Sequence, residues 1–256
     1  MSADSGTASK KQRLSSPAEK LRLLLGTLRR TPQLARIVKE LRVSDWLPVY
    51  EFAGYDERND IVETLSAIVM SCTNLERMTG FYTVYNHELD ALTQALSSRT
   101  RLKERLWIIR DDRAITSSQR NPEFSDEYEH NKQLPRFDYA NAFMQRHVNW
   151  ASLETLVLFG HDGLTGMDYR AFVGTFRKLQ CLKRLSIATF PAEEFDDRTL
   201  QAVPGVHSLR LQSLPGVTDK GIGRWVSSES ATQVRSLTLI DLEITSLQVI
   251  AKAFNN

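Results

Sequence analysis

The stretch Leu153-Glu-Thr-Leu156-Val-Leu158 returns three more times, with small changes, before the chain ends. The later copies read Leu182-Lys-Arg-Leu185-Ser-Ile187, Val206-His-Ser-Leu209-Arg-Leu211 and Val234-Arg-Ser-Leu237-Thr-Leu239. Their middle positions, 156, 185, 209 and 237, are 29, 24 and 28 residues apart. A pattern L-x-x-L-x-L with this period is typical of leucine-rich repeats, in which each copy supplies one short strand.

The repeat predicts both the fold class and the kind of work the protein does. Side chains alternate along a strand, so the three apolar residues of each copy point to one side. One unit cannot bury that side alone, and neighbouring units must therefore stack. We expect an α/β leucine-rich-repeat solenoid, a horseshoe with a parallel concave sheet and helices outside. Such an array offers a binding surface rather than a catalytic pocket.

Two degenerate strands extend the array toward the N-terminus. Residues 75–80 follow a helical pattern at 60–70, and residues 102–108 follow a second one at 87–96. With Leu106 as its middle leucine, the strand at 102–108 has one residue more than the template. Its register is therefore open by one residue, and a slip would exchange its inward and outward faces.

The ends and one interior stretch depart from the repeat. Residues 1–15 are small, polar and basic, and we expect a disordered tail. The motif Ser16-Pro-Ala-Glu19 is a capping box that starts the repeat domain, which we place at 16–256. Residues 111–135 are polar and too numerous for one repeat. We expect an irregular insertion there, which is either a spacer or a segment that folds back over the concave face.

Composition narrows the classes of partner and the compartment. The net charge of +2 comes from 33 basic and 31 acidic residues, which predicts neither nucleic-acid nor membrane binding. No apolar run reaches the roughly 20 residues of a membrane helix. Two cysteines, Cys72 and Cys181, favour two buried free thiols in a reducing compartment. We expect a cytoplasmic or nuclear protein.

The sequence contains no local motif for catalysis or for a cofactor. It lacks both G-x-x-x-x-G-K-[ST] and G-x-G-x-x-G, and His87-Glu88 is not followed by the second histidine of a zinc-binding H-E-x-x-H motif. We therefore expect no enzyme activity, no cofactor and no metal. A triad assembled from residues distant in sequence stays open.

The outward positions of the strands define a candidate binding site. With Leu106 as the middle leucine of the strand at 102–108, an apolar patch covers three consecutive strands and is flanked by arginines. The patch comprises Phe81, Trp107, Ile109, Val157 and Phe159, and the flanking residues are Arg77, Arg105 and Arg184. Aromatic residues beside arginine are common where proteins bind proteins. We expect replacement of Trp107 and Phe159 to remove binding without unfolding the chain, unless the insertion or the core covers these side chains.

Three segments resemble the leucine-rich part of F-box proteins. Leu214-Pro-Gly-Val-Thr218-Asp219-Lys-Gly221-Ile222 is similar to the turn of their repeats, in which Thr or Asp caps the next helix and Gly allows close packing. Residues 21–43 and 86–107 resemble the region after the F-box in fungal members. The resemblance implies the substrate-binding part of a ubiquitin ligase receptor, with a Skp adaptor and cullin as partners if an F-box lies upstream. The F-box itself is not visible, so a stand-alone repeat scaffold or inhibitor is the alternative.

Overall fold

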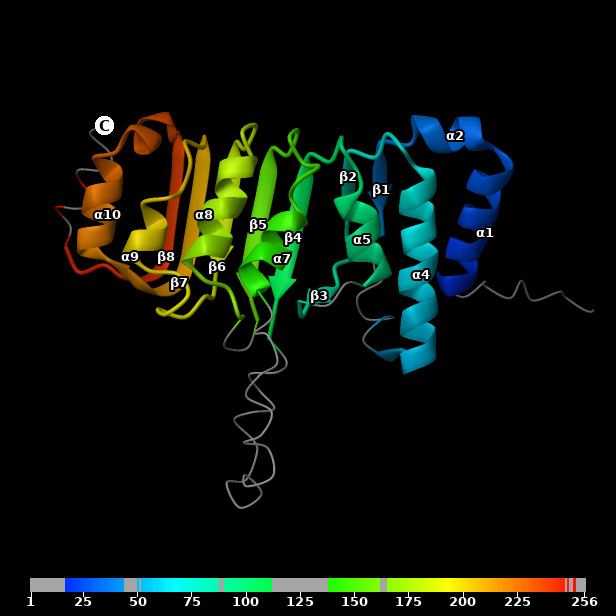
Figure 1. The fold of residues 1–256 in the computed structure, drawn as a ribbon, viewed down its shortest axis with the longest axis horizontal. Helices are drawn as coiled ribbons and strands as arrows, with labels where there is room; N and C mark the ends of the chain where they lie inside the picture. The colour runs from blue at the N-terminus through cyan, green and yellow to red at the C-terminus, as the bar shows by residue number, and fades with distance from the viewer. Residues whose placement is uncertain are drawn as a thin grey trace, which may run out of the picture.

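A row of parallel strands, divided into two sheets and covered by helices along one face, makes up the computed structural model of this chain (Figure 1). The structure describes residues 17–43, 50, 52–87, 90–111, 138–161, 165–246, 248 and 251. The predicted tail at 1–15, the first residue of the capping box and nearly all of the predicted insertion at 111–135 lie outside these residues. The predicted α/β class is confirmed.

The strands follow one another in chain order through two parallel sheets. They are β1 (Glu40–Arg42), β2 (Arg77–Thr79), β3 (Val84–Tyr85), β4 (Glu104–Ile109), β5 (Thr155–Gly160), β6 (Arg184–Ala188), β7 (Ser208–Thr218) and β8 (Ser236–Glu243). All pairs are parallel; β1 and β2 form one sheet, and β3 to β8 form a second. Leu156, Leu185, Leu209 and Leu237 are in register with one another, as the repeat predicts.

The helices lie along one face of the sheet (Figure 1), and the repeat leucines Leu156, Leu185 and Leu209 are buried. They are α1 (Pro17–Arg30), α2 (Pro32–Ile37), α4 (Tyr55–Ser71), α5 (Ala91–Ser97), α7 (Tyr139–Gln145), α8 (Tyr169–Lys178), α9 (Asp197–Leu200), α10 (Asp219–Val226) and the 3-10 helix η3 (Glu229–Gln233). We call the opposite side of the sheet the open face, because no helix of the described residues covers it in Figure 1.

Four successive helices on this face begin with the same carboxylate cap. Asp90, Asp138, Asp168 and Asp196 each accept a hydrogen bond from the backbone N–H three residues later. Such a cap satisfies one of the amide groups that a helix leaves unpaired at its start. It also places the start of α5 at Ala91, four residues beyond the helix start predicted at His87.

The strand of the second unit is broken in two, which the sequence did not predict. Lys103 donates its backbone N–H to Glu76 O at 2.8 Å, so the start of β4 lies beside the residue that precedes β2. The other end of β4 pairs with β3, where Val84 faces Ile108. Between β2 and β3, Gly80 has a φ of 85°, a left-handed conformation that favours glycine. The unit therefore contacts β4 with two short strands.

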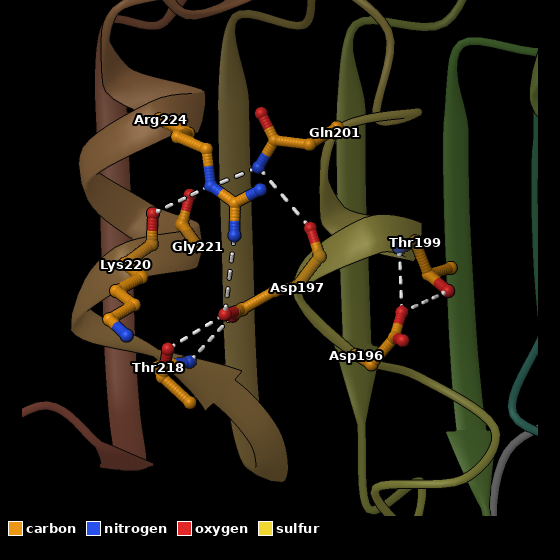
Figure 2. Close-up of polar contacts among 8 residues, drawn as sticks. All are labelled: Asp196, Asp197, Thr199, Gln201, Thr218, Lys220, Gly221 and Arg224. Atoms are coloured by element: carbon orange, nitrogen blue, oxygen red, sulfur yellow. Dashed lines mark hydrogen bonds and ion pairs between the residues drawn. The ribbon is translucent and has the colours of Figure 1, made fainter.

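A carboxylate also joins one repeat to the next (Figure 2). Asp197, the first residue of α9, accepts hydrogen bonds from Thr218 N at 2.8 Å and from Thr218 Oγ1 at 2.7 Å. A Cβ atom at Gly221 would lie 1.9 Å from Asp197 Oδ1, so glycine is needed for this approach. The expected close packing at Gly221 is confirmed. Of the two residues expected to cap the next helix, Thr or Asp, Thr218 is the N-cap residue of α10. Its side chain makes no capping bond, because its hydroxyl donates to Asp197 in the preceding unit.

The two cysteines differ in exposure. Cys72 is buried at the end of α4, as expected, whereas Cys181 is exposed in the turn before β6, and both are free. The prediction of two buried thiols is therefore wrong for Cys181. Among the described helices, none combines the length and apolar character needed to cross a lipid bilayer.

Candidate functional site

An apolar patch does lie on the open face, but β4 contributes other residues than those expected. We define the open-face patch as the side chains of Val84, Leu106, Ile108, Val157 and Phe159. Ile108 is in register with Val84 on one side and with Phe159 on the other, and Leu106 is in register with Val157. Val84 and Phe159 are each 37% exposed, and the other three are half-buried. The patch spans β3, β4 and β5.

The expected outward positions of β4 are wrong because this strand is shifted by one residue. Arg105 faces Leu156 and Trp107 faces Leu158, which places both side chains in the core. Trp107 and Ile109 are 0% exposed and Arg105 is 6% exposed. The third unit thus matches the repeat as Leu102-x-x-Arg105-x-Trp107, with an arginine in the place of the middle leucine. Aligned in this way, the strand no longer has one residue more than the repeat template.

Phe81 is also a core residue rather than a part of the patch. It follows Gly80 in the break between β2 and β3, where the strand alternation no longer holds. Its side chain is 1% exposed, and its ring meets that of Tyr50 edge-on at 5.1 Å between centroids. The prediction that Phe81 lies on the open face is wrong.

The remaining four predicted residues do lie on the open face. Val157 and Phe159 belong to the open-face patch. Arg77 lies 4.0 Å from a carboxylate oxygen of Glu104, and Arg184 Nε donates to Thr155 Oγ1 at 2.9 Å. Both arginines border the patch at the starts of their strands. That these four residues bind a partner stays a prediction.

Buried aromatic rings support the patch from the helix side of β4. The Trp107 ring lies 5.0 Å from the Tyr85 ring, 5.3 Å from that of Phe143 and 5.9 Å from that of Trp150, between centroids. The Arg105 guanidinium carbon lies 4.3 Å from the centroid of the same indole. Aromatic pairs and cation–π contacts of this geometry are favourable beyond simple burial. The open-face patch therefore rests on a closely packed layer.

Burial changes the ionisation of two groups in this layer. Burial lowers the pKa of Arg105 to about 10, while the negative charge of Asp90 acts in the opposite direction. The guanidinium therefore stays charged near neutral pH, and its position over the indole compensates part of the burial cost. Burial lowers the pKa of His147 to about 3, so that imidazole is neutral.

A row of charges at the starts of the strands would have predicted the correct register. Lys39, Glu76, Lys103, Glu154 and Lys183 occupy equivalent positions, because each bonds the next through its backbone. Their charges alternate across the strands. Ion pairs of 3.7 Å for Lys39–Glu76, 2.7 Å for Lys103–Glu76 and 3.3 Å for Lys183–Glu154 follow from this order. Alignment on this row would have placed Leu106 and Ile108 outward.

Comparisons with known proteins assign this chain to no family. No protein-family model matches the chain. The curated proteins contain no match either. Among solved structures, the chain is similar to the leucine-rich repeat-containing protein LegL7 from Legionella pneumophila, with 12% identity and a TM-score of 0.38. That match covers 95% of this chain and 96% of the LegL7 chain. The leucine-rich-repeat-like fold follows from this chain's own strand register.

Proposed function

We propose that this chain is a protein-recognition module that binds its partner through the open-face patch and performs no chemistry of its own. One observation carries the proposal: five apolar side chains gather on three neighbouring strands, on the side of the sheet that the described helices leave open. Contiguous exposed apolar surface is uncommon on soluble proteins except where it binds something. The packed aromatic layer beneath it would keep the surface in one shape, which lowers the entropic cost of binding.

A more specific form of the proposal takes the chain as the substrate-binding part of an F-box-like ubiquitin ligase receptor. The support is the resemblance of residues 214–222 to the turn of F-box repeats, together with the close approach at Gly221. In this form the units curve into a horseshoe and the open face is its concave side. The ligase would reach the chain through a Skp adaptor and cullin, in the cytoplasm or nucleus.

The experiment replaces the patch without disturbing the sheet. Leu106→Thr with Phe159→Thr removes apolar surface but keeps residues that favour strands. Wild type and this double variant would each be purified by affinity from native cells, and the co-purifying proteins compared by mass spectrometry. Proteins lost only with the double variant would then be tested with the purified chain by calorimetry. We expect at least one of them to bind wild type and to bind the variant at least about tenfold more weakly.

The matched control lies on the same face, away from the patch. Ser186→Thr and Thr238→Ser change outward positions of β6 and β8 and should retain every partner. A folded double variant with an unchanged set of partners would refute the proposal. Skp adaptor and cullin among the partners would support the ligase form. Partners without any ligase component would favour a stand-alone scaffold or inhibitor.

A further inference from the structure

Beside the open-face patch, β6 and β7 each present one arginine on the open face. Arg184 and Arg210 are both exposed, whereas the leucines next to them are buried. Ser186, two residues after Arg184, is in register with Arg210. Adjacent strands lie about 4.8 Å apart and rise about 3.3 Å per residue, so roughly 8 Å separates the two arginine Cα atoms. One bound segment can therefore contact both side chains.

Both guanidinium groups bond uncharged partners. Arg184 Nε donates to Thr155 Oγ1 at 2.9 Å. Arg210 Nη2 donates to Gln212 Oε1 at 2.6 Å. Within the described ranges of the chain, neither arginine forms an ion pair, and neither β6 nor β7 contains Asp or Glu. Two positive charges on this part of the sheet thus have no carboxylate bonded to them within those ranges.

Two carboxylates at the border of the patch are paired with other basic residues. Glu104 lies 4.0 Å from Arg77 and two strands away from Arg184. Glu154 precedes β5 and lies 3.3 Å from Lys183. Each of these pairs carries no net charge, so neither of them offsets the charge of Arg184.

The acidic residues of β8 lie too far along their strand to offset Arg210. Thr238 is the residue of β8 in register with Arg210, and Asp241 follows it by three residues. At about 3.3 Å per residue, Asp241 lies roughly 10 Å further along the sheet, and Glu243 lies further still. Exposed charges separated by more than about 8 Å are largely screened at physiological salt. Among the described residues, the outward surface of β6 and β7 is therefore positive.

Arg184 connects this positive surface with the apolar patch. Thr155, which accepts its hydrogen bond, lies two residues before Val157 on the same face of β5. Apolar contact and positive charge are therefore adjacent on the open face. This combination suits a protein segment in which apolar side chains stand next to a carboxylate. Nucleic acids are bound mainly through many phosphate contacts, for which five apolar side chains offer no partner.

From this adjacency, we infer that the partner places the carboxylate of an Asp or Glu side chain over β6 and β7 while its apolar side chains cover the open-face patch. The inference rests on the proposed function and deepens it, because it defines the bound segment as apolar residues adjoining an acidic one. Arg184 and Arg210 bind the carboxylate, since a guanidinium group can donate two parallel hydrogen bonds to its two oxygens. Complementary charge also fixes the direction in which the segment lies across the strands.

Selection from a phage-displayed library of random 12-residue peptides tests the inference on the full chain. We expect the enriched peptides to contain Asp or Glu beside a group of apolar residues. Arg184→Gln with Arg210→Gln should weaken the binding of an enriched peptide at least about tenfold in fluorescence anisotropy, since hydrogen bonds between charged groups are among the strongest. Circular dichroism would confirm that this variant is folded. Undiminished binding of the acidic peptide by the folded variant would overturn the inference.

Reversal of the charge gives a readout that a loss of structure cannot produce. A second selection would use Arg184→Glu with Arg210→Glu, which repels carboxylates and attracts basic side chains. We expect this variant to enrich peptides with Lys or Arg in place of Asp or Glu, beside the same kind of apolar residues. Continued enrichment of acidic peptides by the folded variant would contradict the assigned role of the two arginines.

The matched control removes the same charge from the helices. Arg29→Gln with Arg177→Gln replaces two exposed arginines, one in α1 and one in α8. We expect this variant to bind an enriched acidic peptide as wild type does. Equal weakening by both glutamine double variants would make net charge the cause and would overturn the inference.

The remaining outcomes separate this inference from the proposed function. Apolar peptides that bind wild type, fail to bind the Leu106→Thr and Phe159→Thr variant and show no acidic preference would overturn the inference alone. Tighter binding of a random 12-nucleotide DNA strand than of any enriched peptide would overturn it in favour of phosphate recognition. Enrichment of no peptide by the folded chain would count against both the inference and the proposed function.

Discussion

Trp107 donates its indole N–H to Nε2 of His147 at 3.2 Å, in a fully buried position. Nδ1 of the same imidazole lies 2.9 Å from Phe143 O. Because Nε2 accepts from the indole, the ring proton is on Nδ1 and is donated to that carbonyl. Both nitrogens of a neutral histidine are thus satisfied in the core. The pair ties β4 to the end of α7 and fixes which face of β4 is turned inward.

The shifted register predicts losses of stability of very different size for two adjacent residues. Trp107→Ala should lower the free energy of unfolding by about 3–5 kcal/mol, because it leaves a cavity in the aromatic layer and an unpaired imidazole. Leu106→Thr, on the open face, should change it by less than about 1 kcal/mol. Urea unfolding followed by tryptophan fluorescence and circular dichroism measures both. Equal losses for the two variants would contradict the register of β4.

His147 should make the fold sensitive to acid. Its pKa is about 3 in the folded chain and near its ordinary value of 6.5 in the unfolded chain. Above pH 6.5 neither state binds the proton and the residue has no effect. As pH falls from 6.5 toward 3, only the unfolded state takes up the proton, which costs about 1.4 kcal/mol of stability per pH unit.

The control for this effect is His147→Gln, which keeps an oxygen to accept from Trp107. Its unfolding free energy, measured by urea titration at several pH values, should fall less steeply than that of wild type between pH 6 and 4.5. Parallel curves for the two proteins would rule out His147 as the source of the acid sensitivity.

The two hydrogen bonds that Thr218, at the start of α10, donates to Asp197 in α9 should stabilise the fold. Asp197→Ala leaves the backbone N–H and hydroxyl of Thr218 without their acceptor, and we expect a loss of about 1–3 kcal/mol. Asp219 occupies the same position in the next unit and bonds Thr245 Oγ1 at 2.7 Å at an exposed site. Asp219→Ala should therefore cost less than Asp197→Ala in the same thermal unfolding measurement. The reverse order would show that the Asp197–Thr218 contact in Figure 2 is weaker than the contact between Asp219 and Thr245.

Two glycines of α10 should respond in opposite directions to the same substitution. Gly221→Ala brings a methyl group against the Asp197 carboxylate and should destabilise the chain by about 1–3 kcal/mol. Gly223 has nothing within 4 Å of an added Cβ. Gly223→Ala should instead stabilise by about 0.5–1 kcal/mol, because alanine loses less backbone entropy in a helix. Melting temperatures measured side by side test this, and a rise for both variants would contradict the close approach at Gly221.

Three of the four misplaced residues of the candidate site belong to one strand, β4, and the fourth, Phe81, lies in the break between β2 and β3. Val157 and Phe159 were placed correctly, because β5 follows the leucine pattern without exception. Trp107, Ile109 and Arg105 were placed on the wrong face, because Leu106 matched the pattern better than an arginine at the middle position. Hydrophobicity alone assigns arginine to the surface, since its burial is costly without partners. The charge alternation from Lys39 to Lys183 was a second signal that the leucine pattern concealed.

The sequence by itself determined the stack of parallel strands, the side on which the helices lie and the alignment of β5 to β8. These follow from a local period that repeats without any need for distant contacts. Only the tertiary structure decided the inward face of β4 and the break between β2 and β3. The reason is that Arg105 can be buried only where Trp107 lies beneath its guanidinium and Asp90 supplies a negative charge nearby. Asp90 comes from a different segment of the chain, and its approach exists only after the repeats have packed.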